Sequence, residues 1–336
     1  MDNLITRHIT HAGARIYRLP MRVFPSLIAF AHLVISEGYV ALVDVGSGLG
    51  DSHADLCAAF DRLAVLWGEP VGWDDLDRIV ITHAHIDHHG GLNAIRTLSD
   101  APIAVHILDR RVLVHYEERL ALTRVRISQF LQQAGLDSDQ RTQLLALYNQ
   151  SKGVFQSLPV QDSVQDGDLL DERFRIYHVP GHCPGQICLQ LDNILLSADH
   201  ILPDVALFLA PESLTASTGL EHFLQSLRKA AQIPDLQVSL GGHGAPVHTI
   251  AAAIAQIEQQ QQRRIARLHN ACTQAQTLAE LAAALYPRAQ GYDQLLALQK
   301  IGAYVEYLDQ RGMLAIVNYR EVAADEHVAP RYQAWR

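Results

Sequence analysis

Short apolar runs separated by polar turns fill the first hundred residues of the chain. Residues 28–35 and 40–45 are apolar runs on either side of a turn at 37–38, and they predict a strand followed by its returning partner. Residues 51–66 carry apolar side chains at helical spacing, and residues 78–82 form another β-rich run. Because strands and helices alternate in this way, the pattern predicts an α/β fold in which helices cover the sheets.

The pattern changes between residues 108 and 158. Apolar side chains such as Leu120, Phe130 and Leu144 recur there at helical spacing, and little of the segment is typical of a strand. Residues 110–152 hold seven Lys or Arg against four Asp or Glu, so this part is locally basic. The sequence therefore predicts a helical insertion at about residues 108–158.

Strand patterns return after the insertion and end before a helical C-terminal part. The β-rich runs are residues 174–179, 187–191, 194–197 and 238–240. A helix is expected from Thr218 or Gly219 to about Ala231, and from Thr249 onward the pattern predicts three helices and a short β element. We therefore expect a larger domain, residues 1–248, which contains the insertion, and a small helical domain, residues 249–336.

Composition and charge exclude several classes of protein. The chain has 336 residues, 49% of them hydrophobic, and a mean hydropathy of +0.02, as is typical of a globular protein. No uninterrupted apolar run approaches the roughly 18 residues of a membrane span, and residues 1–18 lack the features of a signal peptide. The expected location is therefore the cytoplasm, where the four cysteines should be reduced. The net charge of −9 argues against broad binding to nucleic acid.

Candidate metal ligands gather directly after the predicted strand at residues 78–82. Within six residues the chain places His83, His85, Asp87 and His88. Alternate side chains of an extended segment point the same way, so His83 and His85 can face one metal ion. The turn that follows lets Asp87 and His88 face a second ion. Imidazoles and carboxylates suit Zn²⁺ and similar cations.

Three further candidates lie in loops or at strand ends elsewhere in the chain. His182 follows Gly181, Asp199 ends the run at residues 194–197, and His243 lies between two glycines. Taken singly, each has an ordinary structural interpretation, because loop histidines are common at surfaces and aspartates are common in turns. The four sites together, in this order, are much harder to obtain by chance.

The order H-x-H-x-D-H, Gly-His, Ala-Asp and Gly-His-Gly resembles the metal-ligand pattern of the metallo-β-lactamase superfamily, over roughly residues 16–246. The resemblance implies three sets of ligands: His83, His85 and His182 for a first metal, Asp87, His88 and His243 for a second, and Asp199 as a bridge between them. It also implies an αββα sandwich with the metals at one edge, and it gives Asp44 a supporting role behind the ligands. The C-terminal helices resemble the winged-helix-like domain of one branch of β-lactamase-like hydrolases.

The same pattern separates the chain from two branches of that superfamily. Oxygen-reducing flavodiiron proteins have Glu where this chain has His85, and the classical zinc β-lactamases have Cys where it has Asp199. Antibiotic hydrolysis is therefore not expected to be the main activity.

The resemblance implies a binuclear hydrolase. Two divalent metal ions, zinc by default with iron or manganese as alternatives, would share a water molecule and lower its pKa to about 7. The resulting hydroxide would attack a carbonyl or phosphoryl centre, and Asp87, a ligand by resemblance, is the candidate proton acceptor. No Ser or Cys nucleophile is needed, so Cys183 is interpreted as a packing residue. His89 is interpreted as a supporting or solvent-facing residue.

Three functions remain open from the sequence. The first is hydrolysis of a small acyl compound, such as a thioester, as in relatives of glyoxalase II, a lactone or another ester. The basic side of the insertion could attract an anionic substrate such as an acyl-CoA; its arginines are Arg111, Arg119, Arg124 and Arg126. The second function is a phosphodiesterase or ribonuclease, against which stand the net charge and the mixed charges at residues 292–311. The third is a regulatory protein that keeps the fold. We interpret the C-terminal helices as packing or forming a homodimer, with no membrane partner.

Overall fold

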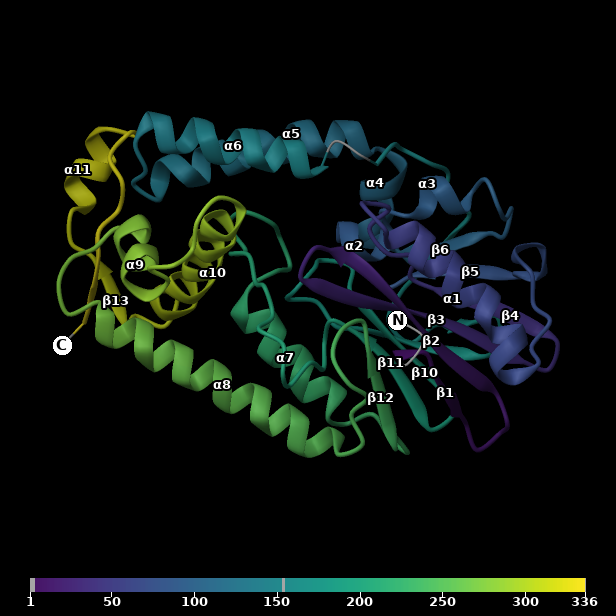
Figure 1. Ribbon diagram of the computed structural model, residues 1–336. Coiled ribbons are helices and arrows are strands. Elements are labelled where there is room, and N and C mark those ends of the chain that lie inside the picture. Colours follow the sequence, from purple (N-terminus) through teal and green to yellow (C-terminus); the bar gives the residue numbers. More distant parts are fainter. Residues whose placement is uncertain (1–3, 153–154, 336) are drawn as a thin grey trace.

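The computed structural model describes residues 4–152 and 155–335. Two β-sheets form the centre of the larger part, and helices cover the outer face of each (Figure 1). The predicted αββα sandwich is therefore confirmed. Helices of the insertion extend from this sandwich. A group of C-terminal helices lies at the other end of the molecule from the sheets.

The first sheet has seven strands in chain order. Strands β1 to β4 pair antiparallel, whereas β4 to β7 pair parallel. The strands are β1 (Thr6–Ile9), β2 (Arg15–Phe24), β3 (Leu27–Ser36), β4 (Tyr39–Val43), β5 (Arg78–Ile81), β6 (Ile103–His106) and β7 (Asp162–Val164). The parallel half carries its connecting helices on the outer face, as crossovers between parallel strands require.

The second sheet has five strands in the order β12-β11-β10-β9-β8. The strands are β8 (Leu169–Leu170), β9 (Phe174–His178), β10 (Ile187–Leu191), β11 (Ile194–Ala198) and β12 (Val238–Gly241). All pairs are antiparallel except β11 with β12. Val34 and Val80 of the first sheet and Phe174 and Ile187 of the second belong to one buried cluster, so the two sheets share a core.

Helices close the sandwich on both sides. On the first sheet lie α1 (Ser52–Trp67), the 3-10 turn η2 (Trp73–Asp75), α2 (Ile86–His89) and α3 (Leu92–Ile95). On the second sheet lies α7 (Leu220–Ala230), which buries Leu220, Phe223, Leu224 and Leu227 at the spacing of one helix face. Gly219 caps this helix, as the sequence predicts.

The predicted helices of the insertion are present as α4 (Ile107–Val114), α5 (Tyr116–Gln133) and α6 (Ser138–Lys152). Figure 1 shows α5 and α6 side by side, reaching from the sandwich toward the C-terminal helices. Phe130 and Leu131 of α5 are buried in the same cluster as Leu295 and Leu298. The insertion therefore packs against the C-terminal part instead of standing free in solvent.

The C-terminal part contains α8 (Ile250–Ala271), α9 (Leu278–Leu285), α10 (Tyr292–Asp309), β13 (Leu314–Ile316), α11 (Tyr319–Ala324) and β14 (Tyr332–Ala334). The predicted capping box of α9 is confirmed: Thr277 N donates to Glu280 Oε2 at 2.8 Å, and Glu280 N donates to Thr277 Oγ1 at 3.2 Å. The structure adds α11 and pairs β13 with β14. The domain boundary at residues 248/249 and the winged-helix-like character stay predictions. Among the described residues, no helix has the length and apolar character to cross a membrane.

Gly90 and Gly91 are needed for a reason other than backbone freedom. Their φ angles are −62° and −73°, which any residue adopts. A Cβ atom on Gly90 would lie 2.2 Å from the carbonyl oxygen of Ser47, and one on Gly91 would lie 2.2 Å from that of Val45. The glycines therefore let the helix that carries the histidines approach the loop after β4.

Replacing Gly90 by alanine is expected to lower the free energy of unfolding by about 1–3 kcal/mol, because the backbone of either segment must move. Urea unfolding measures the change. Gly72→Ala is the matched control, since Gly72 is exposed and its added Cβ would meet only Asp75 Oδ2 at 3.5 Å. Equal effects of the two substitutions would contradict the steric explanation.

Candidate metal centre

The candidate ligands come from four loops at the carboxyl ends of strands. His83, His85, Asp87 and His88 follow β5, His182 follows β9, Asp199 follows β11 and His243 follows β12. The fold brings them together as two groups, in each of which the potential ligand atoms lie within 4.8 Å of one another. All seven residues predicted from the sequence belong to these groups. That they bind metal stays a prediction.

The first group consists of His83, His85 and His182. His85 Nδ1 and His182 Nε2 in this group are 2.8 Å apart. The His83 ring lies edge-on to both of the others, with centroid separations of 4.8 and 5.1 Å. Three imidazole nitrogens within reach of one ion suit Zn²⁺, which binds histidine nitrogens.

The second group consists of Asp87, His88, Asp199 and His243. His243 Nε2 lies 3.3 Å from Asp87 Oδ2. Asp199 Oδ1 is 3.4 Å from His88 Nε2 in this group, while Asp199 Oδ2 is 3.4 Å from His182 Nε2 in the first group. Asp199 Oδ2 also lies 3.6 Å from His243 Nε2. The carboxylate therefore lies between the two groups, which is the position that a bridging carboxylate requires.

Oxygen atoms behind the ligands fix the orientation of the imidazoles. His182 Nδ1 lies 2.6 Å from the carbonyl oxygen of Phe208, and His243 Nδ1 lies 2.7 Å from that of Ile28. His88 Nδ1 lies 2.8 Å from Asp44 Oδ2. In each ring the Nδ1–H can donate to this oxygen, and in the neutral ring Nε2 then carries the free lone pair toward the centre, as in established metal sites.

Asp44 has the supporting position that the resemblance implies. Besides His88, it accepts hydrogen bonds from Thr82 N and Thr82 Oγ1, both at 2.8 Å. Its side chain is 2% exposed. Asp44 therefore contacts both His88 of the second group and Thr82, the residue before His83 of the first group. In this way it links the two groups of ligands.

The electrostatics of the centre favour cations. Burial and the neighbouring imidazoles lower the pKa of His83 and of His85 well below the usual range, so both rings are neutral and able to ligate. Burial opposes ionisation of Asp199, but positive charge on His88 and His243 outweighs it and holds the pKa of Asp199 well below the usual range. The carboxylates in turn raise the pKa of both histidines. Asp87 is held ionised in the same way. Two carboxylate charges are therefore buried side by side.

The donor atoms fit divalent metal ions. His83 Nε2, His88 Nε2 and Asp199 Oδ1 are buried and have no hydrogen-bond partner within the described part of the chain. Buried polar atoms without a partner are costly, so these three atoms fit a site that holds cations. The set of five imidazoles and two carboxylates suits zinc, and also iron or manganese.

Asp109 is a supporting residue that the sequence did not reveal. It is 1% exposed at the start of α4. Its carboxylate accepts hydrogen bonds from Ala84 N at 2.8 Å and Gly185 N at 2.9 Å, and from the Cys183 thiol at 3.2 Å. It therefore connects the loop of His83 and His85 to the loop of His182. A lone aspartate in a helical segment carries no sequence signal for this role.

Arg18 is a second supporting residue that was missed. Its guanidinium stacks on the Phe30 ring, 3.7 Å from the centroid, and donates to the carbonyl oxygens of Gly241 and Gly244 at 3.3 and 2.9 Å. These two residues flank the segment that carries His243. An arginine in the middle of β2 thus holds the loop of a candidate ligand.

Neighbouring histidines and Cys183 have structural positions. His89 is 1% exposed and packs edge-on against Phe155, so the solvent-facing alternative for it was wrong. His200 is also buried and contacts the Phe223 ring. Burial, reinforced by the adjacent Asp109 carboxylate, raises the pKa of the Cys183 thiol well above its usual range, so it is no thiolate nucleophile.

The arginines of the insertion lie at its surface. Arg111, Arg124 and Arg126 are exposed, and Arg119 pairs with Glu118. Arg124 lines a cavity of about 340 Å³ together with Tyr116. That these arginines attract an anionic substrate stays a prediction.

The model of the metallo-beta-lactamase superfamily matches residues 26–243, well over half of the chain and the whole span of the seven candidate ligands. The chain belongs to this superfamily. Its members are mostly hydrolases and usually bind metal ions. No curated protein sequence matches the chain.

Two solved structures resemble this superfamily member over nearly its whole length. A metallo-beta-lactamase family protein from Thermus thermophilus is 22% identical, with a TM-score of 0.75 over 95% of this chain and 98% of its own. A beta-lactamase domain protein from Burkholderia ambifaria is 19% identical, with a TM-score of 0.71 over 98% of this chain and 95% of its own. At these identities the likeness shows a common fold, which includes the insertion and the C-terminal helices.

Proposed function

We propose that this protein is a binuclear metal-dependent hydrolase of a small acyl substrate: a thioester, a lactone or another ester. The observation that carries the proposal is the position of Asp199, with one oxygen 3.4 Å from His88 Nε2 and the other 3.4 Å from His182 Nε2. A carboxylate between two imidazole groups supports two cations that act together rather than one structural ion.

Each residue of the centre has a proposed role. His83, His85 and His182 would hold one divalent ion, Asp87, His88 and His243 the other, and Asp199 both. When bound, such ions supply Lewis acidity and a water molecule of lowered pKa. Asp87 Oδ2 would accept the proton released in the reaction, because the carboxylate is ionised and its side chain, at 15% exposure, is more open to solvent than that of Asp199.

Hydrolysis of nucleic acid is less well supported. A helix that recognises nucleic acid must be exposed and basic. In this chain the candidate for such a helix is α10, the third C-terminal helix. It instead buries one face against the rest of the protein, with Leu295, Leu298, Ile301, Tyr304 and Leu308. With a net charge of −9, the chain offers no strong attraction for a phosphate backbone.

A panel of substrates tests the proposal. Protein loaded with zinc would be incubated with an acyl-CoA, an acylglutathione, an acyl lactone, bis-nitrophenyl phosphate and a short RNA, with Asp199→Ala protein as the blank. We expect turnover of a thioester, lactone or ester that the blank lacks. Turnover of the phosphodiester or RNA alone would replace the proposal with a nuclease function. Full metal occupancy without any turnover would favour a regulatory role.

A further inference from the structure

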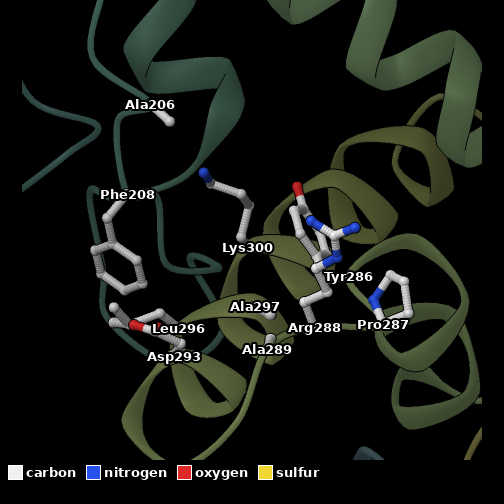
Figure 2. A pocket seen from close by; sticks show the side chains of 10 residues that line it. All are labelled: Ala206, Phe208, Tyr286, Pro287, Arg288, Ala289, Asp293, Leu296, Ala297 and Lys300. Carbon is white, nitrogen blue, oxygen red and sulfur yellow. The ribbon is translucent and has the colours of Figure 1, made fainter.

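A cavity of about 580 Å³ lies between the loop after β11 and the C-terminal helices. This is the size of a site for a small molecule. Ala206 and Phe208 line it from the loop, while Tyr286, Leu296 and Lys300 line it from the end of α9 and from α10 (Figure 2). Its walls are mostly apolar. They come both from the loop that follows β11 and from the C-terminal helices.

Phe208 connects this cavity to the candidate metal centre. Its carbonyl oxygen is the partner of His182 Nδ1 at 2.6 Å. Its ring centroid lies 6.4 Å from that of His85 and 6.5 Å from that of His182, in edge-on contacts. A molecule in the cavity is therefore one side chain away from the first group of ligands.

Lys300 brings an uncompensated charge into the cavity. Figure 2 shows its side chain extending from α10 toward Ala206, between Phe208 and Tyr286. Among the residues that the structure describes, its ammonium group has neither an ion-pair nor a hydrogen-bond partner. Burial, with Arg264 nearby, lowers the pKa of Lys300 to about 8, so the group still carries its charge at neutral pH. Lys300 is half-buried, so its ammonium group is available to an anionic ligand that enters the cavity.

Further cations lie in or near the cavity. Arg288 lines the same cavity. Arg264 of α8 acts on Lys300, and both Arg264 and Arg267 oppose the rise that burial causes in the pKa of Tyr286. None of these arginines forms an ion pair with another described residue. The lining contains one carboxylate, Asp293, which is exposed and is not paired with Lys300. Because Lys300 and Arg288 both line the cavity and neither forms an ion pair with a described residue, the cavity favours an anionic ligand.

We infer that this cavity binds the anionic, non-reacting end of the acyl substrate, with Lys300 as its main charged contact and Arg288 at its rim. The inference rests on the proposed function. It narrows the substrate to an acyl compound that carries a carboxylate or phosphate group, either on its leaving group or on its acyl part, away from the bond that is hydrolysed. The apolar walls would cover the neutral part of that group, and Phe208 would separate the anion from the metals.

Direct binding tests the cavity without any turnover. Isothermal titration calorimetry would use coenzyme A as the phosphate probe and S-methylglutathione as the carboxylate probe. We expect one of them to bind, and Lys300→Met to raise its dissociation constant about tenfold or more. Methionine keeps the apolar stem, so the variant should fold. Lys300→Arg should retain most of the affinity, and Arg228→Met, which removes an exposed charge on α7 outside the cavity, should bind like the wild type.

Kinetics separate this inference from the proposed function. Acetyl-CoA would be compared with S-acetyl-N-acetylcysteamine, a thioester with a neutral carrier. We expect Lys300→Met to raise KM about tenfold for the anionic thioester alone, with kcat nearly unchanged for both. If wild type hydrolyses both thioesters and Lys300→Met leaves each KM unchanged, the inference fails and the proposed function stands. If neither thioester nor any lactone or ester of the panel is hydrolysed but a probe binds through Lys300, the cavity stands and the proposed function fails.

Two other outcomes would overturn the inference. One is that neither probe binds at millimolar concentration. The other is that a short RNA binds in place of the small anions and is released by Lys300→Met, since the cations would then serve a nucleic-acid backbone.

Discussion

Asp199→Ala is expected to leave at most one metal ion per chain and to lower turnover by more than about 100-fold, beyond the loss typical of residues that only support ligands. The reason is geometric: each oxygen of Asp199 lies 3.4 Å from a ligand nitrogen of a different group. Removing the carboxylate also removes a buried negative charge that offsets the mutual repulsion of two cations. Metal content by mass spectrometry and turnover of the best substrate of the panel measure the two effects.

The matched control for this substitution is Asp204→Ala. Asp204 lies five residues farther along the same loop and is exposed, with only a weak contact of 3.4 Å from Gln256. It should keep full metal content and turnover. An Asp199→Ala protein that still binds two ions and remains active would show that Asp199 is not the bridge.

Asp44→Asn is expected to weaken metal binding at the second group by about 10–100-fold, with a comparable loss of turnover at limiting metal. The amide can accept fewer of the three hydrogen bonds that Thr82 and His88 direct at the carboxylate. It also cannot stabilise His88 by charge. Asp44 has a φ of 61°, a left-handed conformation that asparagine tolerates, so the backbone should stay in place.

Asp235→Asn makes the same chemical change at a residue with the same backbone conformation. Asp235 has a φ of 62° and is exposed. Titration of metal-stripped protein with zinc should give unchanged affinities for this variant. If Asp44→Asn also binds zinc like the wild type, then Asp44 does not orient His88 in the way that the structure indicates.

The sequence predicted the ligands because short-range rules place them. His83 and His85 lie two residues apart in the short bent connection between β5 and α2, and His182, Asp199 and His243 follow strands whose ends converge in this fold. The helices were predicted for a similar reason. The expected helix at residues 292–310 is α10 (Tyr292–Asp309), since its apolar spacing is uninterrupted.

Strand β2 was not predicted, and its burial gives the reason. Seven of its ten residues are buried in one nearly continuous run, so it lacks the alternation of a half-buried strand. Arg18 and Pro20 also interrupt the apolar pattern. The arginine is tolerated because it stacks on Phe30 and reaches carbonyl groups 223 and 226 residues away in the chain.

Contacts over such distances could not be deduced from a single sequence. Asp109 meets Gly185 across 76 residues, and Phe208 meets His182 across 26. Lys300 shares a cavity with Ala206 although nearly a hundred residues separate them. Local sequence patterns therefore predicted the seven candidate ligands. The supporting residues and the proposed anion-binding cavity depend on tertiary packing, which those patterns do not contain.

The metal content of the wild-type protein tests the central claim most directly. Protein stripped with a chelator and dialysed against zinc would be measured by mass spectrometry, and its thioester or lactone hydrolysis followed as a function of bound zinc. We predict two zinc ions per chain, with turnover that appears as the second site fills. A chain that binds no ion, or that reaches full activity with none, would contradict the account.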